Sequence, residues 1–388
     1  MFTFLRSARK SLAFAAATLS TLVLAGCEPV ATAGGTGLPA GKPVEVALLV
    51  PSGSGDASDE LLGRSIENAA RLAITDLGSV QIDLRVYPTG ASPAQAASAA
   101  QQAVAEGAKI IVGPLRAEEA NAAGVAVAAS GVNVLSFSNN PAIAGGNVFV
   151  LGPTFENSAR RLAGYAVRSG KSKVMIVSDQ NTAGEAGRNA IQRGVTAAGG
   201  SVVAQGSYEF SQNGIIQAVP AIAAQAKSSG AQAVFLTADA AGALPLVSQL
   251  LSENGVSPAM YQYIGLTRWD IPAATLALPG VQGGWFAIPD PALYAQYQNR
   301  YAAAFGEAPH PVSAVAYDAI AAIGALAKKG SGLDRASLTQ GAGFAGVNGV
   351  FRLLPDGTNE RGLAVAQIQS GSVVVVDPAP RSFGGAGF

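Results

Sequence analysis

Short apolar runs alternate with helical patterns along most of the chain, and this alternation constrains the fold more than any other feature. Val44–Val50 is apolar at nearly every position and ends at Pro51, as expected for a buried strand. Residues 58–77 instead place Leu61 and Ile66 on one helical stripe. Strands separated by helices form βαβ units. The sequence therefore predicts an α/β protein with mostly parallel sheets.

The alternation runs through two successive series. In the first we expect strands at 44–50, 81–87, 109–112 and 133–137, and helices at 58–77, 92–106 and 116–130. In the second we expect helices at 155–169, 183–198, 215–229 and 240–252, and strands at 173–177, 201–208, 231–237, 260–265 and 283–288. Helices at 292–305 and 312–328 and strands at 349–353, 363–369 and 373–376 follow. Two such series predict two lobes, and because ligands bind beyond the carboxyl ends of the strands, a ligand cleft between the lobes.

The beginning of the chain has the pattern of a secretory signal. A basic stretch (Arg6, Arg9, Lys10) precedes an apolar run that ends in Leu24-Ala25-Gly26-Cys27. This ending resembles the lipobox of bacterial lipoproteins, in which the chain is cut before an acylated cysteine. We expect residues 1–26 to be removed and Cys27 to carry a lipid. An ordinary signal peptide with a chance cysteine and an N-terminal membrane helix are the alternatives, although about 20 apolar residues are needed to span a bilayer.

Composition limits the partners that the mature chain can have. Without residues 1–26, which hold three basic residues and no acid, the chain has 22 Lys and Arg against 25 Asp and Glu. A net charge of −3 argues against a nucleic-acid partner, because no basic surplus neutralises phosphates. Residues 27–43 are rich in Gly, Pro, Ala and Thr and predict a flexible tether. With Cys27 lipidated no disulfide can form, so the fold depends on its core.

The chain is also short of catalytic and metal-binding residues. Cys27 and His310 are the only residues of their types, so a Cys/His zinc site and a cysteine nucleophile are excluded. His310 precedes a helix, where we expect it exposed, and no Gly-x-Ser-x-Gly motif accompanies it. Gly53-x-Gly55 lacks the third glycine of a dinucleotide fingerprint. We therefore expect no enzyme activity, no cofactor and no metal.

Five motifs in order resemble the type I periplasmic binding proteins of the leucine/isoleucine/valine-binding group. The chain opens with Val46-Ala47-Leu48-Leu49-Val50-Pro51 and, after Gly63, Asn68-Ala69-Ala70-Arg71-Leu72-Ala73-Ile74. The later motifs are Ala108-Lys109-Ile110-Ile111-Val112-Gly113-Pro114-Leu115, Asn133-Val134-Leu135-Ser136-Phe137-Ser138-Asn139-Asn140-Pro141, Val315-Ala316-Tyr317-Asp318-Ala319, and Gly346-x-x-Gly349 with Phe351 and Asp356-Gly357. The resemblance spans roughly residues 44–376.

This resemblance implies two Rossmann-like lobes that close on a small solute. By analogy, lobe 1 comprises 44–152 and 282–332, lobe 2 comprises 153–281 and 333–378, and residues 379–388 form a tail. The activity that it implies is capture of amino acids or similar small polar solutes, followed by docking on an ABC permease. The expected location is periplasmic, with the lipid anchored in a bacterial membrane, the outer one in a Gram-negative cell.

The resemblance also selects candidate ligand-binding residues. Arg116, Ser136, Ser138 and Asn139 are expected from lobe 1, and Asp239, Thr267 and Trp269 from lobe 2. In amino-acid binders the loop after strand three supplies a hydroxyl, but here it is Arg116-Ala117-Glu118; the usual acid near Thr267 is displaced to Asp270. Arg116 could instead bind a carboxylate, and Trp269 could form a wall of the pocket. Solvated loops or turn-stabilising side chains are the alternative for each polar residue.

A second function is compatible with the same fold. Some outer-membrane lipoproteins that activate penicillin-binding peptidoglycan synthases carry a domain similar to this family. Three features favour this alternative. The chain is expected to carry a lipid anchor, its cleft lacks the usual amino-acid contacts, and Glu28 replaces the Asp that often retains lipoproteins at the inner membrane. Those activators usually have a helical-repeat domain, for which this chain has no room. Solute binding therefore remains our first hypothesis.

Overall fold

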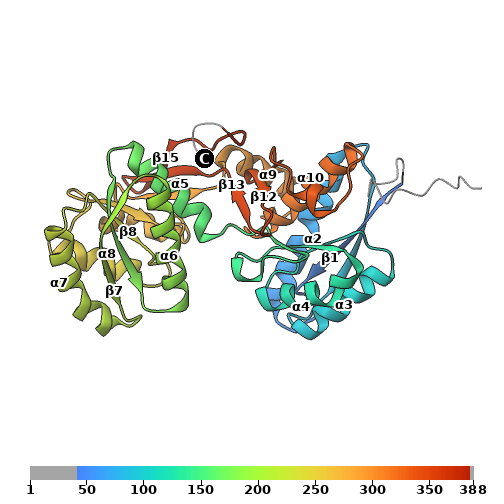
Figure 1. Ribbon diagram of the computed structural model, residues 1–388, viewed down its shortest axis with the longest axis horizontal. Helices are drawn as coiled ribbons and strands as arrows, with labels where there is room; N and C mark the ends of the chain where they lie inside the picture. Colours follow the sequence, from blue (N-terminus) through green and yellow to red (C-terminus); the bar gives the residue numbers. More distant parts are fainter. Residues whose placement is uncertain (1–41, 385–388) are drawn as a thin grey trace, which may run out of the picture. The chain divides into compact units, whose positions relative to one another are not determined.

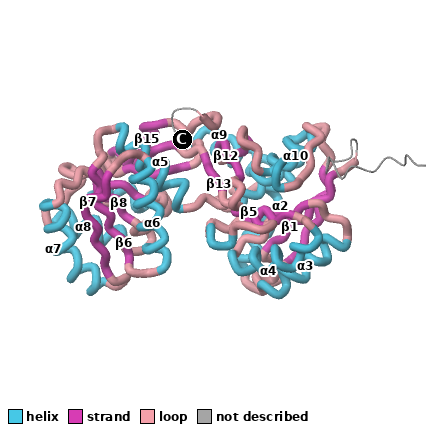
Figure 2. The backbone as a smooth tube through the Cα atoms, in the orientation of Figure 1, coloured by secondary structure: helices cyan, strands magenta, loops and turns pink. Residues whose placement is uncertain are grey.

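A computed structural model describes residues 42–384 of the chain. The expected signal peptide, the lipidation site Cys27 and all but the end of the expected tether lie outside the described residues. The described chain forms three β-sheets with helices packed against them (Figures 1 and 2). Within this part of the chain, no helix is both long and apolar enough to cross a membrane.

The elements follow one another in the expected order. The first series consists of β1 (Val44–Val50), α2 (Ala57–Leu77), β2 (Ile82–Pro88), α3 (Pro93–Ala105), β3 (Ile110–Val112), α4 (Ala117–Val127), β4 (Asn133–Ser136) and β5 (Val148–Val150). The second consists of α5 (Phe155–Arg168), β6 (Lys173–Asp179), α6 (Thr182–Ala197), β7 (Ser201–Tyr208), α7 (Gln212–Ser228), β8 (Ala233–Leu236), α8 (Leu244–Glu253), β9 (Gln262–Gly265) and β10 (Trp285–Ile288). The last part consists of α9 (Pro291–Phe305), α10 (Ser313–Lys328), α11 (Arg335–Leu338), β11 (Phe344–Gly346), β12 (Gly349–Leu353), β13 (Asn359–Arg361), β14 (Ala364–Gln369) and β15 (Ser372–Asp377).

The first sheet is entirely parallel, in the order β2-β1-β3-β4-β5. Val46 on the central strand β1 pairs with Leu84 and Ile110 on its two neighbours. Side chains of β1 alternate between two buried cores: Val46 and Leu48 pack with α2 and α10, whereas Ala47 and Leu49 pack with α3 and α4. Burial on both faces explains why this strand is a continuous apolar run.

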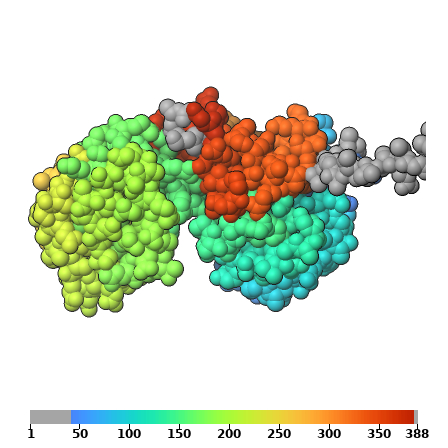
Figure 3. All heavy atoms as spheres, viewed as in Figure 1, coloured from blue at the N-terminus to red at the C-terminus, as the bar shows by residue number. Residues whose placement is uncertain are grey.

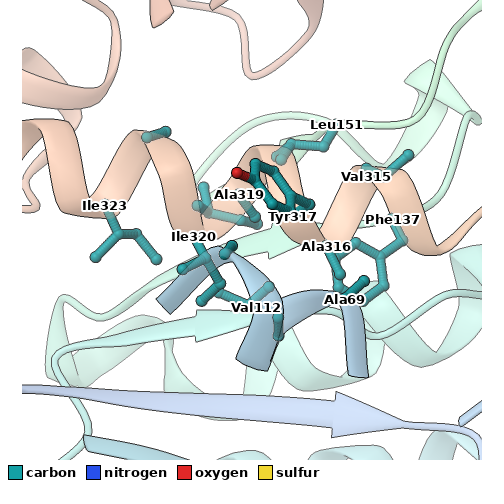
Figure 4. Close-up of a cluster of buried hydrophobic side chains, with 14 of the residues drawn as sticks. Ala69, Val112, Phe137, Leu151, Val315, Ala316, Tyr317, Ala319, Ile320 and Ile323 are labelled. Atoms are coloured by element: carbon teal, nitrogen blue, oxygen red, sulfur yellow. The ribbon is translucent and has the colours of Figure 1, made fainter. Parts of the chain in front are cut away.

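Helix α10 shows how the first core is filled. Ala316, Ile320 and Ile323 point from α10 toward the strands and toward Ala69 of α2 (Figure 4). Small alanines on both helices let the two backbones approach closely over the sheet. In Figure 3 the orange residues of this segment lie against the teal residues of the first series. Helix α10 therefore completes the core that β1 and α2 begin.

The second sheet is mixed, in the order β15-β14-β10-β9-β8-β6-β7. Strands β6 to β10 pair in parallel, and β14 and β15 add antiparallel strands at one side. Its two faces also form separate cores, one with α7 and α8 and the other with α5 and α6. Two parallel α/β units, each with helices on both faces, confirm the expected pair of Rossmann-like lobes.

The pairing changes two of the expected lobe boundaries. Strand β10 belongs to the second sheet, although residues 282–332 were expected in lobe 1. The three-stranded antiparallel sheet β11-β12-β13 was expected in lobe 2, but Phe344, Phe351 and Leu353 join the core of the first sheet. The resemblance could not show where the chain passes from one lobe to the other, because this depends on which strands pair in the folded protein. We assign β10 to lobe 2 and β11–β13 to lobe 1.

Most helices begin at a polar residue that caps them, which explains why the sequence predicted their starts well. The Asp56 carboxylate accepts a hydrogen bond from the Ser58 N–H at the start of α2. Thr154 and Asn157 form a reciprocal capping box at the start of α5. Such caps stabilise a helix by about 1 kcal/mol each. The expected strands and helices are all present, whereas the three-residue strands β5, β11 and β13 were not predicted.

Candidate functional site

A cavity of about 650 Å³ lies at the carboxyl ends of parallel strands from the first and the second sheet. The loop after β3 supplies residues 115–118, and the loop after β4 supplies residues 137–140. The segment after β9 supplies residues 266–268 and Ile271. The end of β10, the starts of α5 and α10, and residues of α9 and β13 add to the wall. This volume is within the usual range for small-molecule sites. The strand ends of both sheets therefore form one ligand-sized space, as the alternating pattern predicted.

Most of the cavity wall is apolar. The aromatic side chains on it are Phe137, Phe155 and Tyr294, which come from three separate segments. The aliphatic side chains are Leu115, Ala117, Leu266, Ile271, Ala287, Val312, Val315 and Leu363, together with Pro153, Pro289 and Pro311. A wall of this kind favours a ligand with an apolar body, because burial of apolar surface contributes about 25 cal/mol per Å².

Arg116 lines the cavity, and its guanidinium is bound to two carboxylates of the protein. Its Nη2 donates to Asp59 Oδ1 at 2.5 Å, and its Nη1 donates to Glu119 Oε1 at 3.3 Å. The hydrogen bond to Asp59 raises the pKa of Arg116 above its usual value despite partial burial, so this side chain remains charged. Arg116 thus joins the start of α4 to the first turn of α2.

Two further arginines on the wall are paired in the same way. Arg268 donates to both carboxylate oxygens of Asp270, with Nε and Oδ1 2.9 Å apart. Arg361 is almost fully buried; its Nη1 donates to Asp318 Oδ2 at 2.9 Å, and its Nε and Nη2 donate to the carbonyl of Leu151. Arg361 thereby ties β13 to α10 and to the segment after β5.

Several hydroxyl and amide groups on the wall already serve the backbone. Ser138 Oγ accepts from the Asn140 N–H, Asn140 Oδ1 accepts from the Ala142 N–H, and Thr154 caps α5. Thr267 is different, because its Oγ1 is buried and has no hydrogen-bond partner among the described residues. A buried polar group without a partner costs free energy, and because Thr267 Oγ1 has no accessible surface it does not face the open cavity.

Four of the seven predicted ligand-binding residues line this cavity: Arg116, Ser138, Asn139 and Thr267. Ser136 lies one layer behind the wall. It is fully buried, its hydroxyl donates to the carbonyl of Pro114, and it accepts from the Ser138 N–H. Ser136 therefore shapes the loop that carries Ser138 and Asn139 and does not face the cavity.

Trp269 is placed in the core of the second sheet and not on the cavity wall. Its ring is fully buried and stacks against Phe286 with centroids 6.5 Å apart. A Cβ at Gly265 would lie 2.2 Å from the ring, and one at Gly284 would lie 2.4 Å from it. The indole thus fits in space that two glycines leave. This correction has a packing cause that the local sequence around Trp269 does not reveal.

Asp239 also lies away from the cavity, beside a different polar cluster. Asp239 is exposed after β8, and Asp179 is buried at the end of β6 with its carboxylate bonded by the Tyr208 hydroxyl. Burial raises the pKa of Asp179; the Tyr208 hydrogen bond opposes this rise, and the charge of Asp239 adds to it. Asp239, which was predicted to contact the ligand from lobe 2, is therefore not on this cavity.

The sequence interpretation missed several wall residues. Arg361, Asn348, Phe155 and Tyr294 come from segments without a ligand motif in the resemblance. Asn348 lies inside Gly346-x-x-Gly349, so of these four residues it was the one that a motif of the resemblance could have indicated. His310 was expected to be exposed but is half-buried before α10, where its backbone N–H donates to Ser65 Oγ. Among the described residues, no three His, Cys, Asp or Glu side chains could together hold a metal ion.

Comparison with known proteins agrees with this architecture. Residues 43–372 match the sequence profile of a family described as periplasmic binding protein. No curated protein sequence matches the chain. Among solved structures, a branched-chain amino acid ABC transporter periplasmic ligand-binding protein from Burkholderia xenovorans is 19% identical, with a TM-score of 0.67 over 89% of this chain and 97% of that one.

Two other similar structures contain ligands. An ABC transporter substrate-binding protein from Desulfitobacterium hafniense in complex with Leu is 17% identical, with a TM-score of 0.62 over 86% of this chain and 100% of that chain. A solute-binding protein from Rhodopseudomonas palustris in complex with 3,4-dihydroxybenzoic acid is 20% identical, with a TM-score of 0.57 over 87% and 96%. At these identities the likeness concerns the fold.

Proposed function

Because the chain belongs to the periplasmic binding protein family, we propose that it is the solute-binding protein of an ABC-type importer. The observation that supports this most is the cavity of about 650 Å³ at the strand ends of both sheets. A small solute there would contact loops of both lobes at once. Binding would favour the arrangement in which both sets of contacts are made, and that arrangement would dock on a permease.

The N-terminal sequence supports a lipid anchor on the outer side of a bacterial membrane. The family is extracytoplasmic, and Leu24-Ala25-Gly26-Cys27 supplies the lipobox pattern. Cys27→Ser removes the only sulfur that could be acylated. We expect mass spectrometry to find the lipid mass on the mature N-terminus of the natural chain, and we expect the variant to lack this mass and to keep residues 1–26. A natural chain without that lipid mass contradicts the anchor.

The class of solute is the next part of the proposal. Solved relatives hold leucine or a hydroxylated benzoic acid, so small solutes with an apolar body are the first to test. The cavity wall agrees with this, since most of its side chains are apolar and three are aromatic. No catalytic role is proposed, because the family captures solutes.

The test is a thermal-shift panel on the purified full-length protein. Amino acids, their amides, small aromatic compounds and muropeptides are each added over a range of concentrations. A ligand that binds only the folded state adds about 2.7 kcal/mol of stability at 100 times its Kd. A concentration-dependent rise in Tm with one compound supports solute capture. A flat panel contradicts it and favours the alternative in which the chain acts on a peptidoglycan synthase.

A matched pair of variants shows whether a positive response arises in this cavity. Leu115→Trp adds bulk to the wall, whereas Leu61→Trp adds the same bulk at an exposed position of α2 that does not line the cavity. We expect Leu115→Trp to abolish the ligand-induced rise in Tm and Leu61→Trp to keep it. Equal responses of the two variants place the solute elsewhere.

A further inference from the structure

Side chains of α5 and residues of β13 join the two lobes at one place. Helix α5 packs on the second sheet, in lobe 2, whereas β13 pairs with β12 in lobe 1 (Figure 1). Resting on the proposed function, in which the lobes move relative to each other, we infer that Asn157 and Arg160 of α5 form a latch with Asn359 and Glu360 of β13. The latch holds the lobes in the arrangement of this structure and opens when they rotate apart.

The segment that leads from β5 to α5 is one of the crossings between the lobes, and it is fixed to lobe 1 up to Gly152. The Asn359 side chain donates to the carbonyls of Val150 and Gly152 at 2.8 and 2.9 Å. The Gly152 N–H donates to the carbonyl of Ser138, also in lobe 1, at 3.0 Å. At this crossing, rotation must therefore occur beyond Gly152, at residues 153–154, which lead directly into α5.

The first latch contact is a hydrogen bond between two buried asparagines. Asn157 Nδ2 donates to the backbone carbonyl of Asn359 at 2.9 Å. The other end of the same amide, Asn157 Oδ1, accepts from the Thr154 N–H in the capping box of α5. Asn359 Oδ1 is buried and has no partner among the described residues. Because an unpartnered buried acceptor costs free energy, this arrangement of the lobes depends on the latch contacts to offset that cost.

The second latch contact is an ion pair in which one carboxylate is shared between the lobes. Glu360 accepts from Arg160 of α5 through Oε1 and from Arg352 of β12 through Oε2. Burial by itself would raise the pKa of Glu360, but the hydrogen bonds from Arg160 and Arg352 outweigh it and lower the pKa, so the carboxylate stays charged. When the lobes separate, Glu360 loses Arg160 and keeps Arg352 of its own lobe. The latch can thus open without leaving this carboxylate unpaired, which would be costly.

Helix α5 also connects the latch to the cavity. Its first four residues include Phe155 and Ser158, which line the cavity, and Asn157 and Arg160 belong to the same two turns. A solute that contacts Phe155 or Ser158 therefore acts on the helix that closes the latch. Coupling between a ligand and a change of arrangement needs such a shared two-state element. The latch then sets how much of the solute-free protein is in this arrangement.

Distances between the lobes, measured without any solute, test the latch. Nitroxide labels are attached at Leu61→Cys and Phe210→Cys, two exposed positions beyond the carboxyl ends of β1 and β7, in the full chain with Cys27→Ser. Double electron–electron resonance gives the distribution of the distance between the two labels. We expect one main distance when the latch is intact. Arg160→Gln should raise the population of a second distance relative to the first by about threefold.

Each latch variant has a control of the same chemistry. Arg193→Gln removes an ion pair with Glu156 that lies within lobe 2, and it should leave the distribution unchanged. Asn157→Asp keeps the oxygen of the capping box but loses the donor to Asn359, so we expect about a fivefold rise of the second population. Asn181→Asp makes the same change at the N-cap of α6 and should cause no rise. Distributions that agree between latch variants and their controls overturn the inference.

Salt provides a test that does not need a latch variant to fold. At 1 M NaCl the Debye length falls to about 3 Å, so the pair of Arg160 and Glu360 is screened and the second population should rise in the labelled chain with an intact latch. No change with salt overturns the ionic half of the latch. Because no solute is added, the result is separate from solute capture. A compound that raises Tm, together with unchanged distances in the latch variants, overturns the latch and leaves the proposed function in place.

Discussion

Two buried aspartates, one in each half of the molecule, have opposite surroundings. Asp318 on α10 is fully buried and accepts hydrogen bonds from Arg361, the Asn348 side chain and the Val347 N–H. Asp179 at the end of β6 is nearly as buried but has only the hydroxyl of Tyr208 on its carboxylate, with Asp239 nearby. No cation among the described residues pairs with it.

Burial acts differently on these two aspartates, because only one of them has a cationic partner. Around Asp318 the charge is compensated, and the pair joins α10 to β13 and to the loop before β12. Around Asp179 burial raises the pKa, which means that the ionised form is unfavourable in the folded state. The first acid supports the fold, whereas the second makes the stability depend on pH.

Removing the compensated acid should have the largest effect. Asp318→Ala leaves the guanidinium of Arg361 buried without its carboxylate. We expect a loss of about 3–5 kcal/mol of unfolding free energy, measured by denaturant titration, because breaking a buried ion pair costs this much. The control Asp83→Ala breaks an exposed pair and should cost less than about 1 kcal/mol. A loss as small for Asp318→Ala as for the control contradicts the compensation.

In the second lobe we test aromatic packing behind the cavity wall, at Trp269, against the ion pair of Asp318 and Arg361 in the first lobe. Trp269→Phe keeps an apolar ring but leaves part of the space beside Gly265 and Gly284 empty. We expect a loss of about 1–3 kcal/mol of unfolding free energy. Because Trp269 is behind the wall, the Kd of a solute found in the thermal-shift panel should change less than twofold. A large change in Kd with unchanged stability would return Trp269 to the ligand site.

How far the sequence predicts this molecule depends on the range of the interactions. Helix α10 was predicted within one residue because its apolar positions repeat locally. Strand β13 was missed because it has only three polar residues, and it is buried through the bond of Arg361 to Asp318, 43 residues earlier in the chain. Periodicity cannot show such pairing.

The same reasoning applies to the site. The loops after β3, β4 and β9 were predictable from the rule that ligands bind at strand ends, and they supply the four predicted residues that line the cavity. The ion pair of Arg116 was not predictable, because its partner Asp59 lies 57 residues away in the chain. An arginine in a loop predicts a carboxylate ligand only until its partners are known.

The uncompensated acid gives a prediction about pH. The folded-state pKa of Asp179 is raised above its ordinary value of 3.8, so the folded state binds more protons than the unfolded state just above that pH. The stability should therefore fall as the pH rises from about 3.8 through the folded pKa. Asp179→Asn removes this titration. We expect the variant to gain stability relative to the natural protein between pH 4 and pH 7, measured by urea titration at both values; a constant difference contradicts the raised pKa.

His310 extends the contrast to a group that becomes a cation, and it lies in the same half as the compensated Asp318. Burial lowers its pKa below 6.5, and its Nδ1 accepts a hydrogen bond from the Val312 N–H, which suits the neutral ring. The unfolded chain therefore binds this proton more readily, so the contribution of His310 to stability is present above about pH 6.5 and is lost as the pH falls through the folded pKa. Since the chain has one histidine, a single ring resonance followed by NMR measures the value without assignment. A titration midpoint below pH 6.5 means that the effect of burial on a pKa depends on the partners of the individual group and not on the half of the molecule in which it lies. A midpoint above pH 6.5 contradicts this, because it requires an acidic partner for His310 and the structure shows burial as the only cause of a shift.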